Sequence, residues 1–289
     1  MNRRGVVKAV AALGATLASR AAFALGADPL RRGAYDDPFM EGGGPGASSC
    51  CPVVELRQYT LHPGKRDVLI DLFEREFIET QEAVGITVIG HFRDLADPNR
   101  FVWLRGFPDM RSRGESLKAF YYGAHWKSLR DSANATIVDN DNVLLLHPAR
   151  PDSGFALEKK VRPAIGAAVP AGLMVATLYY FDAPVDGAFV DFFEQRVKPE
   201  LAAANAAVLA SLTTESSPNT FPVLPVREGE HLFAWFSLFE NQASYESHRA
   251  TLARSAKWSE VSEKMMVRLK FRAPEVLRLS PASRSLLNT

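Results

Sequence analysis

Apolar residues along the chain follow two alternating spacings, one typical of strands and one typical of helices. From 53 to 61 apolar and polar residues alternate, which predicts a strand, and Pro63-Gly64 then turns the chain. Apolar residues at helical spacing run from Val68 to Phe77 and predict a helix. Strands are predicted at 86–93 and 101–107, a second helix at 112–135 and a last strand at 143–146. The predicted order is βαββαβ.

The same order returns in the second part of the chain. The four tryptophans form two pairs that are 132 residues apart: Trp103 with Trp235 and Trp126 with Trp258. Four upstream pairs are 120 residues apart: Tyr59 and Tyr179, Asp71 and Asp191, Phe73 and Phe193, and Glu74 and Glu194. The difference requires 12 additional residues in the second copy, and the Pro-rich run 216–228 can hold them. Equivalent elements are predicted at 173–181, 186–204, 207–213, 231–239, 241–264 and 275–279, so the chain is an internal duplication.

Two βαββαβ units predict an α+β protein of two tandem ferredoxin-like modules. Helices cover one face of the antiparallel sheet in such a module, so the other face needs a partner. We expect the two uncovered faces to pack together within the one chain. The predicted organisation is a signal peptide at 1–27, a flexible linker at 28–52, a first module at 53–150, a linker at 151–171 and a divergent second module at 172–281.

Residues 1–27 have the composition of a targeting segment. They carry four basic residues, no acidic residue and an apolar stretch at 9–19 that is too short to span a bilayer. The start, Asn2-Arg3-Arg4-Gly5-Val6-Val7-Lys8, resembles a bacterial twin-arginine export signal. We therefore expect a periplasmic or extracellular protein without stable membrane insertion. A mitochondrial transit peptide, which is also Arg-rich and acid-poor, is the alternative.

Composition narrows the functional classes. The 289 residues are 47% apolar with a formal net charge of +1, which excludes a disordered chain and argues against a nucleic-acid partner, because that needs a basic face. The two cysteines, Cys50 and Cys51, are adjacent and make a poor metal site. An intermolecular disulfide and an incidental pair both remain open for them.

Three stretches of the first copy resemble the NIPSNAP family: Glu55 to Lys65, Val102 to Arg105 together with Asp109 to Arg113, and His125-Trp126. The resemblance covers roughly residues 53–148 and is much weaker in the second copy. It implies an intrachain dimeric α/β-barrel, in which the two sheets face each other. Relatives in this superfamily include cofactor-independent monooxygenases, lactone isomerases and haem-handling enzymes with sites in the barrel interior. Better-known eukaryotic members are described through partner binding, so the resemblance implies no single activity.

Strand alternation sorts the first copy's residues onto two faces. Glu55, Arg57 and Tyr59 share one face of the first strand, and Trp103 and Arg105 share one face of the third. We expect this charged and aromatic face to line a small cavity inside the barrel and the aliphatic face to carry the helices. The offsets place an uncharged residue where the first copy has each charge: Val175 for Glu55, Thr177 for Arg57 and Ser237 for Arg105. A buried ion pair is weak evidence that its residues stabilise the fold, so charge confined to one copy favours a function specific to that copy. A purely structural ion pair is the alternative.

His91 and Tyr59 are the catalytic candidates. His91 lies in the second predicted strand, on the face of Ile89 and Arg93, and histidine is the usual general base near neutral pH. No pair of histidines has metal-site spacing and no nucleotide-binding motif occurs, so neither a metal nor a cofactor is predicted.

The sequence is compatible with two functions. One is a module that binds a small molecule or a protein partner, with Glu55, Arg57, Tyr59, His91, Trp103 and Arg105 as ligand-binding candidates. The other is a cofactor-independent monooxygenase or isomerase. The sequence leaves open whether the protein is an enzyme, and whether it is a monomeric pseudo-dimer or a higher oligomer.

Overall fold

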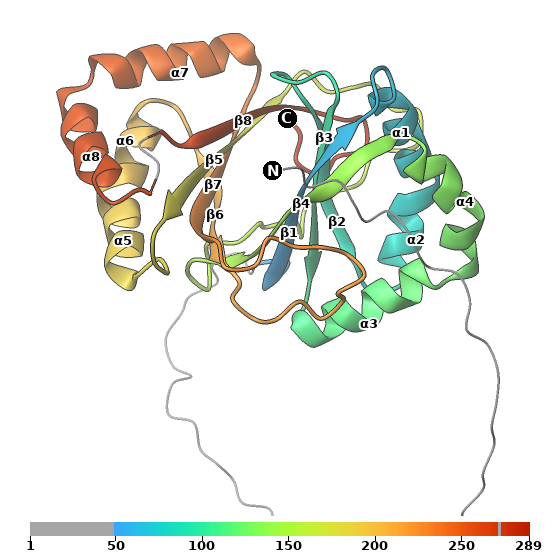
Figure 1. The fold of residues 1–289 in the computed structure, drawn as a ribbon. Helices are drawn as coiled ribbons and strands as arrows, with labels where there is room; N and C mark the ends of the chain where they lie inside the picture. Colours follow the sequence, from blue (N-terminus) through green and yellow to red (C-terminus); the bar gives the residue numbers. More distant parts are fainter. Residues whose placement is uncertain (1–48, 271–272) are drawn as a thin grey trace, which may run out of the picture. The chain divides into compact units, whose positions relative to one another are not determined.

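The computed structural model describes residues 49–270 and 273–289, in which eight strands close into a barrel (Figure 1). Their order around the barrel is β1-β3-β2-β8-β5-β7-β6-β4, and all neighbours are antiparallel. Each half therefore contributes one sheet with the same internal order. The predicted α+β fold, two ferredoxin-like modules that form an intrachain barrel, is confirmed.

The described elements lie close to the predicted ones. The strands are β1 Val53–Leu61, β2 Thr87–Asp94, β3 Arg100–Phe107, β4 Ile137–Pro148, β5 Leu173–Phe181, β6 Val208–Thr214, β7 His231–Phe239 and β8 Glu275–Pro281. The first half has α1 Arg66–Leu72, the π-helical turn η1 Phe73–Phe77, α2 Ile78–Glu82, α3 Met110–Tyr121 and α4 Ala124–Asn134. The second half has α5 Gly187–Phe192, the π-helical turn η2 Phe193–Val197, α6 Lys198–Ala203, α7 Gln242–Arg254 and α8 Ala256–Met266. The predicted signal peptide and most of the predicted 28–52 linker lie outside the described residues.

The predictions of one helix at 112–135 and one at 241–264 are wrong, because each is a pair of helices. Gly123 separates α3 from α4 with an extended backbone at φ −67° and ψ 154°. Ser255 holds the equivalent place 132 residues later and is also extended, and its side chain caps α8 by accepting a hydrogen bond from the N–H of Trp258. The break is thus repeated along with the rest of the module.

Three groups of buried apolar side chains hold the structure together. The barrel interior takes residues from all eight strands, such as Leu56, Leu104, Met174 and Leu212. A second cluster lies between the first sheet and α1 to α4, and a third between the second sheet and α5 to α8. Figure 1 shows these two helical layers on opposite outer sides of the barrel. No helix in the described part of the chain is both long and apolar enough to cross a bilayer.

The prediction that the charged and aromatic face points into the barrel is wrong. Leu56 and Leu104 belong to the interior cluster, whereas Trp103 belongs to the cluster under the helices. An eight-stranded barrel leaves an interior just wide enough for packed side chains, and here the aliphatic face fills it. The bulky aromatic and charged side chains lie instead beneath the helices.

Segments outside the sheet close the interior. Leu286 and Leu287 near the C-terminus, together with Phe155 and Leu157 of the connection between the halves, pack into the interior cluster. Figure 1 places the C-terminus between the two halves of the barrel. The interior is therefore a shared core of both halves.

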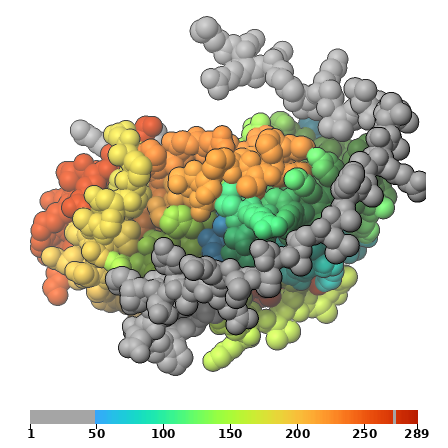
Figure 2. Space-filling model, turned by 90° about the horizontal axis from the view of Figure 1, so that it is seen from below, coloured from blue at the N-terminus to red at the C-terminus, as the bar shows by residue number. Residues whose placement is uncertain are grey.

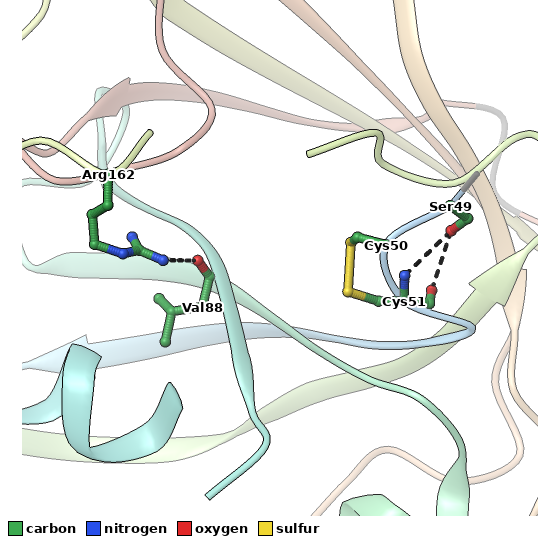
Figure 3. Close-up of a disulfide and its surroundings, with 5 residues drawn as sticks. All are labelled: Ser49, Cys50, Cys51, Val88 and Arg162. Atoms are coloured by element: carbon green, nitrogen blue, oxygen red, sulfur yellow. Dashed lines mark hydrogen bonds between the residues drawn. A yellow bond between two sulfur atoms is a disulfide. The ribbon is translucent and has the colours of Figure 1, made fainter. Parts of the chain in front are cut away.

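The two cysteines form a disulfide with each other just before β1 (Figure 3). The hydroxyl of Ser49 accepts a hydrogen bond from the Cys51 N–H and donates one to the Cys51 carbonyl, each at 3.4 Å. Cys51 is buried against Gly106 of β3, where any side chain would overlap its sulfur. This intrachain pairing is neither of the two outcomes that the sequence left open.

Candidate functional site

Glu55 of β1 accepts hydrogen bonds from three buried arginines. Its Oε2 accepts from Arg57 Nη1 and from Arg105 Nε, both at 2.7 Å, and its Oε1 accepts from Arg113 Nε at 2.6 Å. All four side chains are 0% exposed. Glu55 and Arg105 are direct partners across β1 and β3, Arg57 follows on the same face of β1, and α3 supplies Arg113. We call these four residues the arginine cluster.

The arginine cluster carries more positive than negative charge. One carboxylate accepts hydrogen bonds from three guanidinium groups, and their other hydrogen-bond partners within the sheet and helices of the first half are neutral: Tyr59, Gln81 and Tyr121. Asp141 of β4 interacts with Arg57 electrostatically but is not among its hydrogen-bond partners in the described residues. The Nη2 atom of each arginine has no hydrogen-bond partner among the described residues. Burying unpaired donors and uncompensated charge is unfavourable, and an anion would relieve both.

The electrostatics of Glu55 follow from this arrangement. Burial alone favours the neutral acid, but Arg105, Arg57 and Arg113 together outweigh it and hold the pKa of Glu55 well below its usual range. Glu55 is therefore a carboxylate under all ordinary conditions. Its role is to hold the three arginines in place rather than to exchange a proton.

Trp103 lies between two of the arginines. The Cζ of Arg57 is 5.6 Å and the Cζ of Arg105 is 5.0 Å from its ring centroid, within the range of cation–π contacts. Phe73 of η1 and Tyr59 pack edge-on against the same ring at 5.0 and 6.0 Å. The indole Nε1 has no hydrogen-bond partner among the described residues. The cluster thus combines cationic donors with an aromatic wall.

The second half keeps the aromatic packing and lacks the charges. The residues at the positions of Glu55, Arg57, Gln81, Arg105 and Arg113 are Val175, Thr177, Leu201, Ser237 and Tyr245. There Trp235 Nε1 donates to the Tyr179 hydroxyl at 3.2 Å, whereas the equivalent Tyr59 hydroxyl accepts from Arg57. The same fold therefore forms without the arginine cluster.

His91 and Glu74 form a second polar group under the helices of the first half. His91 Nε2 lies 2.9 Å from Glu74 Oε1, and the other carboxylate oxygen accepts from the Ser283 hydroxyl at 2.6 Å. Burial lowers the pKa of His91, so its imidazole is neutral near pH 7. Since Glu74 only accepts, Nε2 carries the hydrogen and Nδ1 keeps its lone pair, with no partner among the described residues. The geometry gives His91 the form of an oriented base.

The prediction that His91 shares a face with Ile89 is wrong. The pairing of β2 with β3 shifts register between Val88 and Gly90, which marks a bulge. Ile89 points into the barrel, whereas His91 packs against Phe73 under the helices, with ring centroids 5.3 Å apart. One irregular residue therefore moved His91 to the face of the arginine cluster.

All six predicted ligand-binding residues lie on the helix-covered face of the first sheet. Glu55, Arg57, Tyr59, Trp103 and Arg105 are brought together, while the hydrogen-bond partner of His91 is Glu74. The sequence reasoning missed Arg113, Gln81, Tyr121 and Glu74 as members of these groups. A signal existed for Arg113, because the repeat aligns it with an uncharged residue in the same way as its partners.

The second half has a surface hollow of its own, away from these two groups. The hollow, of about 500 Å³, lies at β7 and α7 and is lined in part by Asn205, Glu240 and His248. The His248 side chain is used in a hydrogen bond to the Ala204 carbonyl at 2.8 Å. Within 49–270 and 273–289, no three His, Cys, Asp or Glu side chains gather in a way that could hold a metal ion.

Comparisons with known proteins place this fold. A solved structure of an anthrone oxidase-like protein is 14% identical, covers 81% of this chain and 93% of its own, and superposes with a TM-score of 0.51. An uncharacterized NIPSNAP-like domain protein from Burkholderia xenovorans is 28% identical over 33% of this chain and 84% of its own, with a TM-score of 0.31. A NIPSNAP family protein from Agrobacterium tumefaciens C58 is 21% identical over 34% of this chain and 92% of its own, with a TM-score of 0.31. None of the curated proteins matches the chain. Residues 54–150, which include β1 to β4 and the arginine cluster, match the model of the NIPSNAP family, and we call this matching part of the chain the NIPSNAP module.

Proposed function

We propose that the NIPSNAP module binds a small, negatively charged molecule at the arginine cluster. The observation that carries this proposal is the uncompensated charge: three buried arginines share one carboxylate, and the Nη2 of each has no hydrogen-bond partner among the described residues. The second half supports it, because the same fold forms there with uncharged residues at these places. The cluster is therefore not a requirement of the architecture.

The chemistry of the ligand follows from the groups around it. Guanidinium groups favour carboxylates and phosphates, which accept two parallel hydrogen bonds. Trp103, Phe73 and Tyr59 offer an apolar wall next to these donors. A small carboxylate with an aromatic or apolar body satisfies both features.

A quadruple variant that copies the second half tests the proposal. Glu55→Val, Arg57→Thr, Arg105→Ser and Arg113→Tyr together remove all four charges, so that neither Glu55 nor Arg113 is left buried without its counter-charge. We expect inorganic phosphate and salicylate to raise the melting temperature of the parent protein but not that of the folded quadruple variant. Loss of charge-assisted contacts should weaken salicylate binding about tenfold to a hundredfold.

The control is Arg75→Ala, which removes an exposed arginine that pairs with Asp71. It should leave binding unchanged. A parent that neither anion stabilises contradicts the proposal, and so does a quadruple variant that binds like the parent. A quadruple variant that unfolds assigns the cluster a structural role.

A second candidate function, a cofactor-independent monooxygenase or isomerase, is favoured by the pair of His91 and Glu74. A neutral imidazole held by a carboxylate can take a proton at Nδ1, and the carboxylate then stabilises the imidazolium. The anthrone oxidase-like neighbour supplies a probe. Oxygen consumption with anthrone should rise in the presence of the protein and fall in His91→Gln, whereas a rate equal to that without protein argues against this candidate.

We further propose that the protein is exported by the twin-arginine route. The Cys50–Cys51 disulfide supports an oxidising compartment. A reporter that functions only after twin-arginine export should be active when fused to residues 1–30 and inactive after Arg3→Lys with Arg4→Lys. Unchanged activity in that double variant would exclude the route.

A further inference from the structure

Residues 215–230, the connection between β6 and β7, lie against the NIPSNAP module. This connection contains the additional residues that the change of offset from 120 to 132 requires, whereas the first half joins β2 to β3 by the short turn 95–99. In Figure 1 the segment, in orange, leaves the barrel and runs towards α3. Figure 2 shows it beside α3 from below. We call it the 215–230 loop.

The tip of the loop contacts the arginine cluster directly. Arg113 Nη1 donates to Asn219 Oδ1 at 2.9 Å and to Thr220 Oγ1 at 3.1 Å, while its Nε donates to Glu55. Phe221 stacks on the Tyr121 ring with centroids 5.8 Å apart. One guanidinium group therefore joins the second half's loop to the first half's cluster.

Asn219 organises both the loop and this contact. Its Nδ2 donates to the Leu224 carbonyl at 2.9 Å, which leaves Oδ1 to accept from Arg113 and from the Phe221 N–H at 3.0 Å. Its own N–H donates to Glu228 Oε1 at 3.1 Å. One side chain thus links the folded form of the tip to Arg113, which Thr220 and Glu55 also hold.

The two ends of the loop are fixed elsewhere. The N–H of Glu215 donates to the Leu145 carbonyl at 2.9 Å, and the N–H of Arg227 donates to the Val143 carbonyl at 2.8 Å. Both acceptors belong to β4, whereas the tip rests on α3. The tip and the two ends are therefore held by separate contacts, and Phe221 of the tip is itself buried in the apolar cluster under the helices of the first half.

We infer that the anion site is composite: Asn219 and Thr220 of the second half position Arg113, and the tip of the 215–230 loop controls entry to the cluster. This inference rests on the proposed function. Arg57 and Arg105 are carried by strands, whereas Arg113 is carried by α3, under the loop. Lifting the tip frees the outer side of Arg113 and opens the cluster from that side. The first half of the chain then binds the ligand, and the 215–230 loop of the second half closes over it.

An engineered disulfide between the tip and α3, which we call the lock and which can be opened by reduction, tests the inference. A Cβ atom on Gly114 of α3 would lie 3.1 Å from the Cβ of Thr220, close to the roughly 3.8 Å of a disulfide. We would introduce Gly114→Cys with Thr220→Cys in a Cys50→Ser, Cys51→Ser background. Stopped-flow fluorescence of salicylate then measures binding. The oxidised protein should bind and release salicylate at least tenfold more slowly than the same protein after reduction, with a Kd that changes less than threefold.

Further variants keep the outcomes distinct. The Cys50→Ser, Cys51→Ser parent should show no effect of reduction. Asn219→Ala removes the side chain that organises the tip, so it should accelerate the release of salicylate and weaken salicylate binding several-fold. If the double-cysteine variant does not fold, Asn219→Ala alone tests the inference. Equal rates in the oxidised and reduced lock, or parent-like binding in Asn219→Ala, would overturn the loop inference while salicylate binding itself persists. A parent that binds neither salicylate nor phosphate overturns the proposed function instead.

Discussion

Glu55 shows, at the scale of single residues, what the NIPSNAP module retains that its repeat does not. A buried ion cluster is usually no more stable than apolar residues of the same volume. The second half forms the same strand pair with the uncharged residues Val175 and Ser237 at the places of Glu55 and Arg105. Stability of the fold therefore does not explain the arginine cluster. The proposed binding of an anion, which needs fixed positive charge, accounts for it.

The acid stability of the protein depends on Glu74. Burial opposes its ionisation, but hydrogen bonds from His91, Ser283 and the Arg284 N–H outweigh burial and lower the pKa of Glu74 to about 2 from 4.5. Because the folded pKa is depressed, the contribution is complete above pH 4.5 and is lost as the pH falls towards 2. Between about pH 6 and about pH 2.5 we expect Glu74 to account for about 2 kcal/mol of the stability lost in urea unfolding, allowing for screening by solvent, while Glu55, whose pKa is also lowered, contributes to the same loss.

Glu74→Gln should be less stable than the parent near neutral pH and should lose less stability on acidification. Glu194→Gln, at the equivalent place in the second half, is the matched control. If the parent and Glu74→Gln lose equal stability over this pH range, the network around His91 does not hold Glu74 ionised.

At the scale of elements, the π-helical turns follow from an unusual spacing of buried residues. In the first half the buried positions are four apart: Leu69, Phe73, Phe77 and Gln81. In the second half they are Phe189, Phe193, Val197 and Leu201. A regular α-helix drifts by about 40° at each step of four residues, so it could not keep all of them under one sheet. The wider π turn in the middle restores the alignment.

Removing one residue from the π turn should therefore be far more harmful than changing it. Arg75 lies within η1, and its side chain is 47% exposed. We expect its deletion to rotate α1 against α2, separate Glu74 from His91 and lower the free energy of unfolding by about 2–4 kcal/mol. Arg75→Ala at the same place should change it by less than about 0.5 kcal/mol. Equal stability of the two variants in urea would contradict this explanation of the turn.

The elements also show which parts of the site were predictable. Alternation within β1 and β3 is a local property, so the sequence correctly grouped Glu55, Arg57 and Tyr59 of β1, and Trp103 and Arg105 of β3, on one charged and aromatic face of the sheet. Which face carries the helices depends on the volume available inside the closed barrel, and that prediction was wrong. The bulge in β2 was not visible in the alternation either.

Long-range contacts account for the remaining differences. Arg113 reaches Glu55 from α3, and the pairing of Ser283 with Glu74 joins residues 209 positions apart. No local pattern predicts such pairs. The change in the repeat offset gave the best indication of a long-range contact, because it located the additional residues at 216–228 that form most of the 215–230 loop.

At the scale of the whole molecule, the two halves are joined through their cores more than through their strands. Between the halves, β2 pairs with β8 from Phe92 to Asp94, and β4 pairs with β6 from Leu146 to Pro148. Each seam is three residue pairs long, whereas β5 and β7 pair along nine. The interior cluster, in contrast, draws on every strand. Neither half can bury its aliphatic face without the other.

The protein should therefore unfold in one cooperative step despite its two modules. Leu56→Ala in the first half and Leu178→Ala in the second each leave a hole in the shared interior and should cost about 2–5 kcal/mol. In both variants, fluorescence of Trp103 and Trp235, observed singly after replacing the other tryptophans by Phe, should report the same lowered midpoint. The calorimetric and van't Hoff enthalpies should agree. The contrary result is two separate unfolding transitions, with each substitution lowering only the midpoint of the half that contains it. That result would show that the modules fold independently and that the barrel interior does not couple them.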